Sequence, residues 1–305
     1  MEMKELYYFI AIAEEKSISK AAERLVMALS QFLGILENNV GSKLFIRTSR
    51  GVCLTQEGEL MLQYAYKTLA EYRSVQNEIK DIKQLKSGRV IMGISTFRGS
   101  YLLPPVLNAF HLEHPDVKVE IVEKNSMALE QMLLSGELDI ALLVMSEADP
   151  RLNIERVMKD EICLITSPTH PIRAFVRDNE DNSDSRIPQY VNLKDTLAYE
   201  YLLSDYDTIL GREARRIFNR NGVQPIASNH ALSALMSAAM GAAGLGLAFT
   251  YYSSRHYFRN AEFLSLGAES AFVDLGIALP PGRYHSRAAL ALKDTLMEVL
   301  QAADG

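Results

Sequence analysis

The chain has 305 residues, of which 48% are hydrophobic and 23% are charged, so it is long enough for two or three folded domains and is not of the disordered class. Its formal net charge of −6 excludes an overall basic surface, so any binding of nucleic-acid phosphates must come from local placement of cations. The two cysteines, Cys53 and Cys163, are too few for a disulfide framework or a cysteine metal site, and no apolar run reaches the length of a membrane span.

The first part of the chain, residues 3–54, is patterned as three short helices followed by a basic ribbon. Its apolar residues begin with helical spacing. Ser19 is expected to cap a second helix, and Gly41 is expected to end a third in a left-handed turn. The ribbon contains no acid and three basic side chains, Lys43, Arg47 and Arg50. Short helices and a basic ribbon are the parts of a winged helix-turn-helix, which binds double-stranded DNA.

In this part the chain resembles the LysR-type transcriptional regulators. The resemblance is carried by YYFIAIAEEKSISKAAERL, which begins at Tyr7, and by ALSQFLGILENNVGSKLFIRTSRGVCLTQEGE, which begins at Ala28. It implies that the unit binds promoter DNA. The residues that it leads us to expect at the DNA are Ser19, Lys20, Ser30, Gln31, Lys43, Arg47, Arg50 and Thr55.

Two departures from the family pattern fall on the element expected to read DNA. The family usually carries Ser-Gln-Pro just before the segment that starts at Ala28, and here about three positions are missing, with no turn-forming residue between Leu25 and Leu29. Either the motif is truly shortened, which would disturb base reading, or the printed sequence omits a short turn. We favour the second explanation because the flanking segments keep family spacing. The usual basic residues of the recognition helix are replaced by Gln31, Gly34 and Ile35.

Residues 56–86 are expected to form one long helix. They contain no proline, and their apolar residues recur at alternating steps of four and three, the 3.5-residue period of a helix packed along a partner. About 30 residues extend roughly 45 Å, which favours a dimerisation helix over an amphipathic helix lying on its own domain. The family resemblance likewise implies a linker helix that pairs two subunits. The expected contact residues are Met61, Tyr72, Val75, Ile79 and Ile82.

The rest of the chain, residues 87–305, alternates short apolar strands with helices, which is typical of a doubly wound α/β fold. Strands are expected at 90–94, 117–122, 139–144, 162–165, 201–203, 247–250 and 272–278. Helices are expected at 102–114, 126–134, 212–221, 230–240 and 286–302. Two lobes resembling periplasmic binding proteins would result, with crossings near 166–167 and 265–268. The expected domains are 1–58 for the winged helix-turn-helix, 59–86 for the linker, and 87–305 for the effector domain, with lobe I at 87–166 and 268–305 and lobe II at 167–267.

The best small-molecule signal is the polar segment 95–100, which follows a buried strand and precedes a helix. Open α/β sheets bind ligands at that edge, and Arg98 would favour a carboxylate or phosphate. A solvated capping turn is the alternative, but the resemblance implies effector contacts here. Two other strand ends are weaker candidates. The expected effector-binding residues are Ser95, Thr96, Phe97, Arg98, Ser100, Met145, Ser146 and Thr208.

No catalytic arrangement is visible in the sequence. The six histidines lack metal-ligand spacing, and there is no Gly-x-Ser-x-Gly or phosphate-binding loop. Gly244 and Gly246 follow a helix and precede a strand, the reverse of a dinucleotide fingerprint. We therefore expect no metal, no cofactor and no enzymatic activity. No signal peptide precedes the first helix, so a cytoplasmic location is expected.

The combined expectation is a multidomain chain: an α-rich winged helix-turn-helix, a long linker helix, and a two-lobed α/β effector-binding domain. It is expected to act as a LysR-type regulator that binds promoter DNA as a homodimer or homotetramer, with no membrane partner, and to respond to a small, anionic effector between the lobes. The alternative is a soluble two-lobed binding protein or enzyme whose N-terminal helices serve oligomerisation only.

Overall fold

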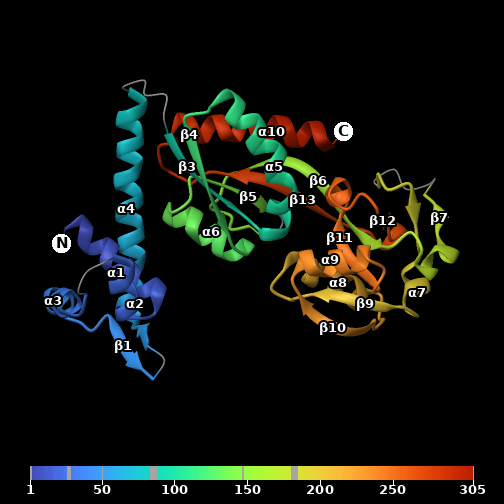
Figure 1. Ribbon diagram of the computed structural model, residues 1–305, viewed down its shortest axis with the longest axis horizontal. Coiled ribbons are helices and arrows are strands. Elements are labelled where there is room, and N and C mark those ends of the chain that lie inside the picture. The colour runs from blue at the N-terminus through green and yellow to red at the C-terminus, as the bar shows by residue number, and fades with distance from the viewer. Residues whose placement is uncertain are drawn as a thin grey trace.

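The computed structural model describes residues 2–25, 29–49, 51–82, 88–145, 148–179 and 185–304. A small N-terminal unit packs on the long helix α4 (Gln56–Ile82), and α4 runs beside a larger α/β region (Figure 1). Within these residues no helix is both long and apolar enough to cross a lipid bilayer.

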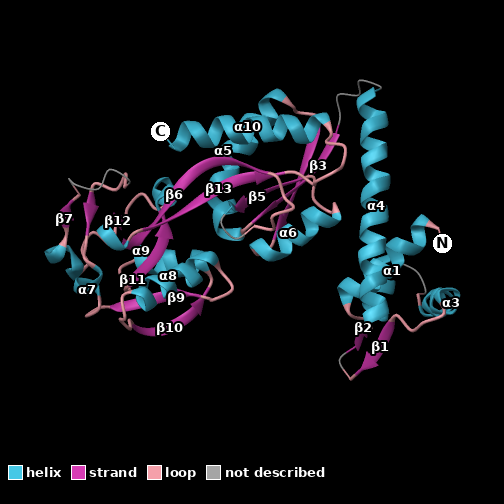
Figure 2. Cartoon of the chain, turned by 180° about the vertical axis from the view of Figure 1, so that it is seen from behind, coloured by secondary structure: helices cyan, strands magenta, loops and turns pink. Residues whose placement is uncertain are grey.

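The N-terminal unit, residues 2–54, has three helices and a hairpin. Its elements are α1 (Met3–Glu15), α2 (Ile18–Leu25), α3 (Ser30–Val40), β1 (Phe45–Thr48) and β2 (Gly51–Leu54). The antiparallel hairpin pairs Phe45 with Leu54 and projects from the unit (Figure 2). Phe9 of α1 is fully buried and its ring lies 5.2 Å from that of Phe45. The expected winged helix-turn-helix architecture is therefore confirmed.

The helix ends in this unit are set by local hydrogen bonds. Gly41 ends α3 with a φ of 79°, as expected. The cap of α2 is Ser17 and not Ser19, because the Ser17 hydroxyl accepts the Lys20 amide at 3.3 Å and its carbonyl accepts the Ala21 amide. Residues 26–28, on which the question of the shortened turn depends, lie outside the described residues.

Helix α4 begins as expected at Gln56, and residues 83–87 at the end of the expected helix lie outside the described residues. Thr55 supplies the cap, since its hydroxyl accepts the Gly58 amide at 2.9 Å. Ala65 and Leu69 are buried against the N-terminal unit, and the Tyr66 hydroxyl donates to Glu14 at 3.2 Å. The first half of α4 therefore belongs to the core of the N-terminal unit.

The α/β region is built on one nine-stranded sheet. Its order is β10-β9-β11-β6-β13-β5-β3-β4, with β12 paired to β6. The strands are β3 (Gly88–Ile94), β4 (Val117–Glu123), β5 (Ile140–Val144), β6 (Ile154–Thr166), β9 (Glu200–Ser204), β10 (Ile226–Leu232), β11 (Leu247–Tyr251), β12 (Glu262–Leu264) and β13 (Ala271–Ala278). β3 is parallel to β4 and β5, and β9 is parallel to β10 and β11. We call the part around β3, β4 and β5 lobe I and the part around β9, β10 and β11 lobe II.

Helices cover both faces of this sheet (Figure 2). They are α5 (Thr96–Glu113), α6 (Ser126–Ser135), α7 (Leu193–Thr196), α8 (Ile209–Arg220), α9 (Ala234–Ala242) and α10 (Arg287–Asp304). Successive residues of β5 face opposite sides: Leu142 joins the core under α5 and α10, whereas Leu143 joins the core under α6. Short elements complete the region: β7 (Arg177–Asp178), β8 (Gln189–Tyr190) and the 3₁₀ turns η2 (Pro171–Phe175), η3 (Tyr252–His256) and η4 (Gly267–Glu269).

Strands β6 and β13 join the two lobes. Residues 154–162 of β6 pair with β13, and residues 162–165 pair with β11 of lobe II. The change of partner thus falls at Ile162, inside the strand, whereas the sequence placed the crossing at its end. A hydrogen-bonded sheet therefore continues from one lobe to the other.

Two expected helices begin elsewhere. The helix expected at 102 begins at Thr96, so Pro104 and Pro105 lie in its interior. Their missing amides remove bonds from an already extended first section of helix, and φ near −65° remains compatible with it. The helix expected from His230 begins only at Ala234, because residues up to Leu232 pair with β9 and Ser233 caps the helix through the Met236 amide.

Glu37 holds α3 against the wing. Its carboxylate is buried and accepts hydrogen bonds from the amides of Leu44 and Phe45 at 2.9 and 3.3 Å and from Lys43 Nζ at 2.6 Å. Burial raises the pKa of Glu37, but these donors lower it further, so the net pKa lies below its ordinary value. A depressed folded-state pKa means that the stabilisation is present above the unfolded pKa and is lost as pH falls through the folded one.

Glu37→Ala is expected to lower the free energy of unfolding of the N-terminal unit by about 2–3 kcal/mol, because two buried amides lose their acceptor. Chemical denaturation followed by circular dichroism measures this. The matched control is Glu23→Ala on the exposed surface of α2. The loss should shrink as the pH is lowered through the acid range. A loss no larger than that of the control would contradict this role.

Candidate functional site

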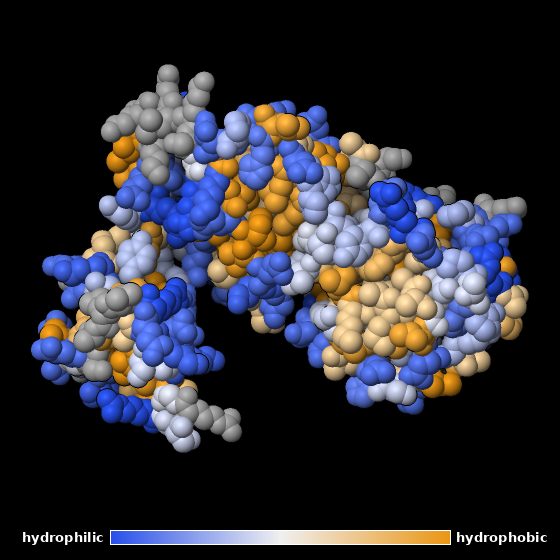
Figure 3. Space-filling view, viewed as in Figure 1, coloured by the Kyte–Doolittle hydropathy of each residue, from blue (hydrophilic) through white to orange (hydrophobic). Residues whose placement is uncertain are grey.

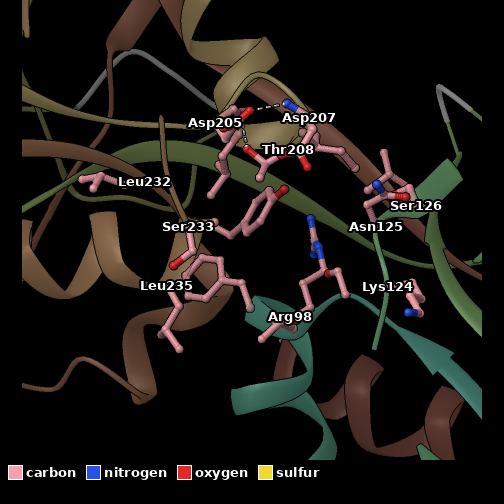
Figure 4. Close-up of a pocket in the computed structure, with 18 of the residues that line it drawn as sticks. Arg98, Lys124, Asn125, Ser126, Asp205, Asp207, Thr208, Leu232, Ser233 and Leu235 are labelled. Carbon is pink, nitrogen blue, oxygen red and sulfur yellow. Dashed lines mark hydrogen bonds between the residues drawn. The ribbon is translucent and has the colours of Figure 1, made fainter. Parts of the chain in front are cut away.

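A cavity of about 470 Å³ lies where the two lobes meet (Figure 4). Its lining comes from segments that follow β3 and β4 in lobe I and β9 and β10 in lobe II. These are the carboxyl ends of parallel strands, the edge at which open α/β sheets bind ligands. Leu142, Leu210 and Leu275 supply part of an apolar floor. The cavity therefore combines apolar surface with polar chain turns, as small-molecule sites do.

Four helices begin at this cavity. Their N-cap residues are Ser95 for α5, Asn125 for α6, Thr208 for α8 and Ser233 for α9, and all four line it. Three of the side chains accept a first-turn amide, at 3.0 Å for Asn125, 2.9 Å for Thr208 and 3.2 Å for Ser233. First-turn amides have no intrahelical acceptor, and the helix dipole adds partial positive charge. Convergence of four such ends favours a ligand with an anionic group.

Arg98 in the first turn of α5 lines the cavity but is not a free cation. Its guanidinium is almost fully buried, pairs with Asp160 of β6 at 3.1 Å, and stacks 3.7 Å above the ring of Tyr251. Its Nη2 atom has no hydrogen-bond partner among the described residues. The expected cation is thus present, and most of its charge is already balanced by a buried carboxylate.

The Arg98–Asp160 pair is the centre of a network that connects the lobes. Asp160 accepts the amide of Ser253 at 3.0 Å and its hydroxyl at 2.7 Å. The Ser253 hydroxyl also lies 2.9 Å from the Tyr101 hydroxyl of α5. Burial raises the pKa of Asp160, whereas Arg98 and Ser253 lower it. This network fixes the start of α5 in lobe I to the η3 turn that follows β11 in lobe II.

The structure brings together most of the expected effector-binding residues. Those that line the cavity are Ser95, Thr96, Phe97, Arg98 and Thr208. Two do not line it: the Ser100 hydroxyl donates to the Phe97 carbonyl at 2.7 Å, and Met145 lies against Gly276 of β13. Ser146 lies outside the described residues.

Sequence reasoning missed about half of the polar lining. The added residues are Lys124, Asn125, Ser126, Asp205, Asp207 and Ser233. Each follows the end of β4, β9 or β10, so the available signal was a polar turn after every parallel strand. Figure 4 shows Asp205, Asp207 and Thr208 together at one side of the cavity and Arg98 and Lys124 at the other.

The surface expected to meet DNA is partly as anticipated. Exposed members are Ser19 and Lys20 on α2, Gln31 on α3, and Lys43 and Arg47 at the wing. Lys43 remains mostly exposed although it pairs with Glu37. Thr55 is committed within the unit, since its hydroxyl donates to the Lys43 carbonyl at 2.7 Å. The side chain of Ser30 and the whole of Arg50 lie outside the described residues.

Helix α4 carries an exposed apolar stripe. Tyr72, Val75 and Ile79 are each about half exposed, as the dimer expectation requires. Met61 differs, because it packs against the core of its own N-terminal unit, and the side chain of Ile82 lies outside the described residues. Leu60 and Tyr64 are exposed and extend the stripe.

The other side of α4 is attached to lobe I. Asp81 accepts the Tyr284 hydroxyl at 2.8 Å and the Arg287 amide at 2.9 Å, which places its carboxylate at the start of α10. Arg73 donates to the Glu137 carbonyl at 3.2 Å. One helix thus contacts both the N-terminal unit and lobe I. In the part of the chain that the structure describes, no group of three or more His, Cys, Asp or Glu residues could hold a metal ion.

Comparisons with known proteins match both parts of the chain. The family described as LysR substrate binding domain matches residues 83–301, and the bacterial regulatory helix-turn-helix protein, lysR family, matches residues 3–59. A probable RuBisCO transcriptional regulator of Trieres chinensis is 29% identical over 247 residues, covering 79% of either chain. The transcriptional regulator BenM of Acinetobacter baylyi is 27% identical over 263 residues, covering 84% of this chain and 82% of BenM.

Solved structures share the fold over nearly the whole length. Full-length CbnR complexed with its target DNA has a TM-score of 0.67 at 18% identity, covering 98% of this chain and 100% of CbnR. Full-length OxyR from Pseudomonas aeruginosa has a TM-score of 0.66 at 23% identity, covering 97% of this chain and 98% of OxyR. The effector binding domain of QuiR, in complex with shikimate, has a TM-score of 0.56 at 18% identity and covers 71% of this chain and 98% of that domain.

Arg98→Met is expected to lower the free energy of unfolding of the α/β region by about 3–5 kcal/mol, because it leaves the Asp160 carboxylate buried without its counter-charge. Adding Asp160→Asn should restore part of the loss, so the two effects are non-additive in a double-mutant cycle measured by urea unfolding. Strictly additive losses would mean that the pair does not couple the two elements.

Proposed function

We propose that this chain, which belongs to the LysR family of transcriptional regulators, binds promoter DNA as a symmetric dimer through its two N-terminal units and changes that binding when a small effector occupies the cavity between its lobes. The observation that carries the proposal is the combination, in one chain, of a helix-turn-helix unit with an exposed basic wing and a two-lobed region in which four helix N-termini surround one cavity.

The DNA contacts are proposed to divide into positioning and reading groups. Lys20 and Arg47 are exposed cations on α2 and the wing, with no ion pair to any described residue, and would bind phosphates. Lys43 would add a contact at the cost of weakening its bond to Glu37. Thr55, whose hydroxyl is engaged at the start of α4, would act by positioning the wing.

Base reading is proposed for α3. Gln31 and Ile35 are exposed one helical turn apart, and between them Gly34 has no heavy atom within 4 Å of the place where a Cβ would stand. The fold therefore gives no steric reason for this glycine, although glycine in a helix costs roughly 0.5–1 kcal/mol relative to alanine. A close approach of the helix backbone to DNA would supply the reason. Gln31 suits adenine and Ile35 suits a thymine methyl group.

The dimer is proposed to form along the exposed stripe of α4. Its members are Leu60, Tyr64, Tyr72, Val75 and Ile79, an apolar row that the chain leaves in water. Pairing two such helices buries the row and places two winged units side by side. Hydrophobic side chains also gather on the face of lobe I over α5 and β4 (Figure 3), where Leu112 and Ile121 are exposed, and they offer a second contact for assembly beyond the dimer.

Transmission is proposed to run through α4. The effector cavity is bounded by α5 and α6 of lobe I, and lobe I contacts α4 through Arg73 and Asp81. A ligand that favours one spacing of the lobes would shift the population of subunit arrangements, and hence the spacing of the winged units. The proposed domains remain 1–58, 59–86 and 87–305, with lobe I and lobe II exchanging within β6 rather than after it.

Arg47→Ala is expected to weaken binding to a duplex from the upstream region of the protein's own coding sequence. It removes one phosphate contact, so affinity should fall similarly on every sequence, and the slope of log affinity against log salt should decrease by about one contact. Fluorescence anisotropy over a salt series measures both. The control is Lys67→Ala, an exposed cation on α4 away from the wing. Equal salt slopes for Arg47→Ala and wild type would contradict the assignment, and the absence of specific binding at low salt would refute DNA recognition itself.

A further inference from the structure

The two walls of the effector cavity carry opposite charge. On the lobe I wall the charged lining residues are Arg98 and Lys124, and no acidic residue of that lobe lines the cavity. On the lobe II wall the charged lining residues are Asp205 and Asp207, and no basic residue of that lobe lines it. Figure 4 shows the two acids facing the cavity region from the side opposite Arg98 and Lys124. The cavity is therefore dipolar rather than simply cationic.

The lobe I wall can hold an anion. The N-termini of α5 and α6 both end there, and Lys124 is an exposed ammonium group beside them. Arg98 contributes a second feature that points to a ligand, since its buried Nη2 atom lacks a partner among the described residues. Its charge is shared with Asp160, so it adds a hydrogen-bond donor more than net positive charge.

The lobe II wall is suited to a cation. Neither Asp205 nor Asp207 has an ion pair within 4.0 Å to any residue that the structure describes. The Asp205 carboxylate accepts only the Asp207 amide, at 3.1 Å, and Asp207 is exposed. Both precede α8, where acids favour the helix dipole, but Thr208 already caps that helix through the Gly211 amide. Two unpaired carboxylates would repel a ligand that carried only negative charge.

We propose that the effector is zwitterionic: its carboxylate binds the lobe I wall at Lys124 and the start of α5, and its ammonium group binds Asp205 and Asp207 of lobe II. A short apolar body between the two groups would cover the floor formed by Leu142, Leu210 and Leu275. An amino acid with an apolar side chain is the simplest ligand of this class. This inference rests on the proposed effector site and specifies its chemistry.

A dipolar ligand would also favour closure of the lobes. Its two ends bind different lobes, so the full set of charge-assisted hydrogen bonds is available only when the walls approach each other. A simple carboxylate would engage lobe I alone and would gain little from closure. The class of ligand thus determines whether binding is coupled to the arrangement of the lobes.

The test compares three probes of one carbon skeleton on the full-length chain: phenylalanine, 3-phenylpropionate and 2-phenylethylamine. We expect phenylalanine at about 10 mM to raise the thermal midpoint, and titration calorimetry to show it binding about tenfold or more tightly than either partner probe. In Asp205→Asn/Asp207→Asn this preference over 3-phenylpropionate should disappear. The control Asp116→Asn changes an exposed acid at the opposite end of β4 and should keep the preference.

The outcomes separate this inference from the proposed function. Equal binding of phenylalanine and 3-phenylpropionate by the wild-type chain would overturn the zwitterionic ligand and leave an anion site intact. Tighter binding of 2-phenylethylamine than of phenylalanine, or no midpoint shift with any of the three probes, would also overturn it. None of these results changes the DNA affinity measured without a probe, so failure of DNA recognition is seen independently.

Discussion

The buried ion pair between Arg98 and Asp160 is the constraint on which the effector region depends. It fixes the first turn of α5, and with it the amides that line one wall, to β6 and to the turn that carries Ser253. A buried pair of this kind adds little net stability compared with an apolar core, but it costs several kcal/mol to break and is satisfied by one geometry. The lobes therefore meet through a polar contact that specifies their spacing better than an apolar surface would.

Continuity of the sheet gives that contact its reach. Because β6 pairs with β13 in one section and with β11 in the next, a change in the angle between the lobes must bend or twist strands that both lobes share. Lobe I is in turn attached to α4 through Asp81, which occupies the start of α10. A ligand at the cavity and the winged unit are thus connected through packed elements with few mobile joints, as a two-state regulator requires.

Much of this organisation could be predicted from sequence, and the failures have physical causes. Buried parallel strands are continuous apolar runs, so β3, β5 and β11 were found. β10 was taken for helix because it is an edge strand with residues such as Ser228 and His230 exposed, so it lacks a buried face and the alternation that marks one. The cap of α2 was assigned to Ser19 because two serines lie within one turn, and only hydrogen bonds choose Ser17. Asn125 and Ser233 became site residues only when strand order brought their turns to one edge.

The most direct test of the account is a footprint on the DNA upstream of the protein's own coding sequence, made with the wild-type chain and with Ile79→Asp, which places a charge in the exposed stripe of α4. Light scattering first establishes that the variant is monomeric. The account predicts that the wild-type chain protects two symmetric half-sites whose centres are separated by a multiple of about 10.5 base pairs, and that the variant loses this paired protection at the same concentration. Paired protection by a monomeric variant, or no protected half-sites with the wild-type chain, would contradict it.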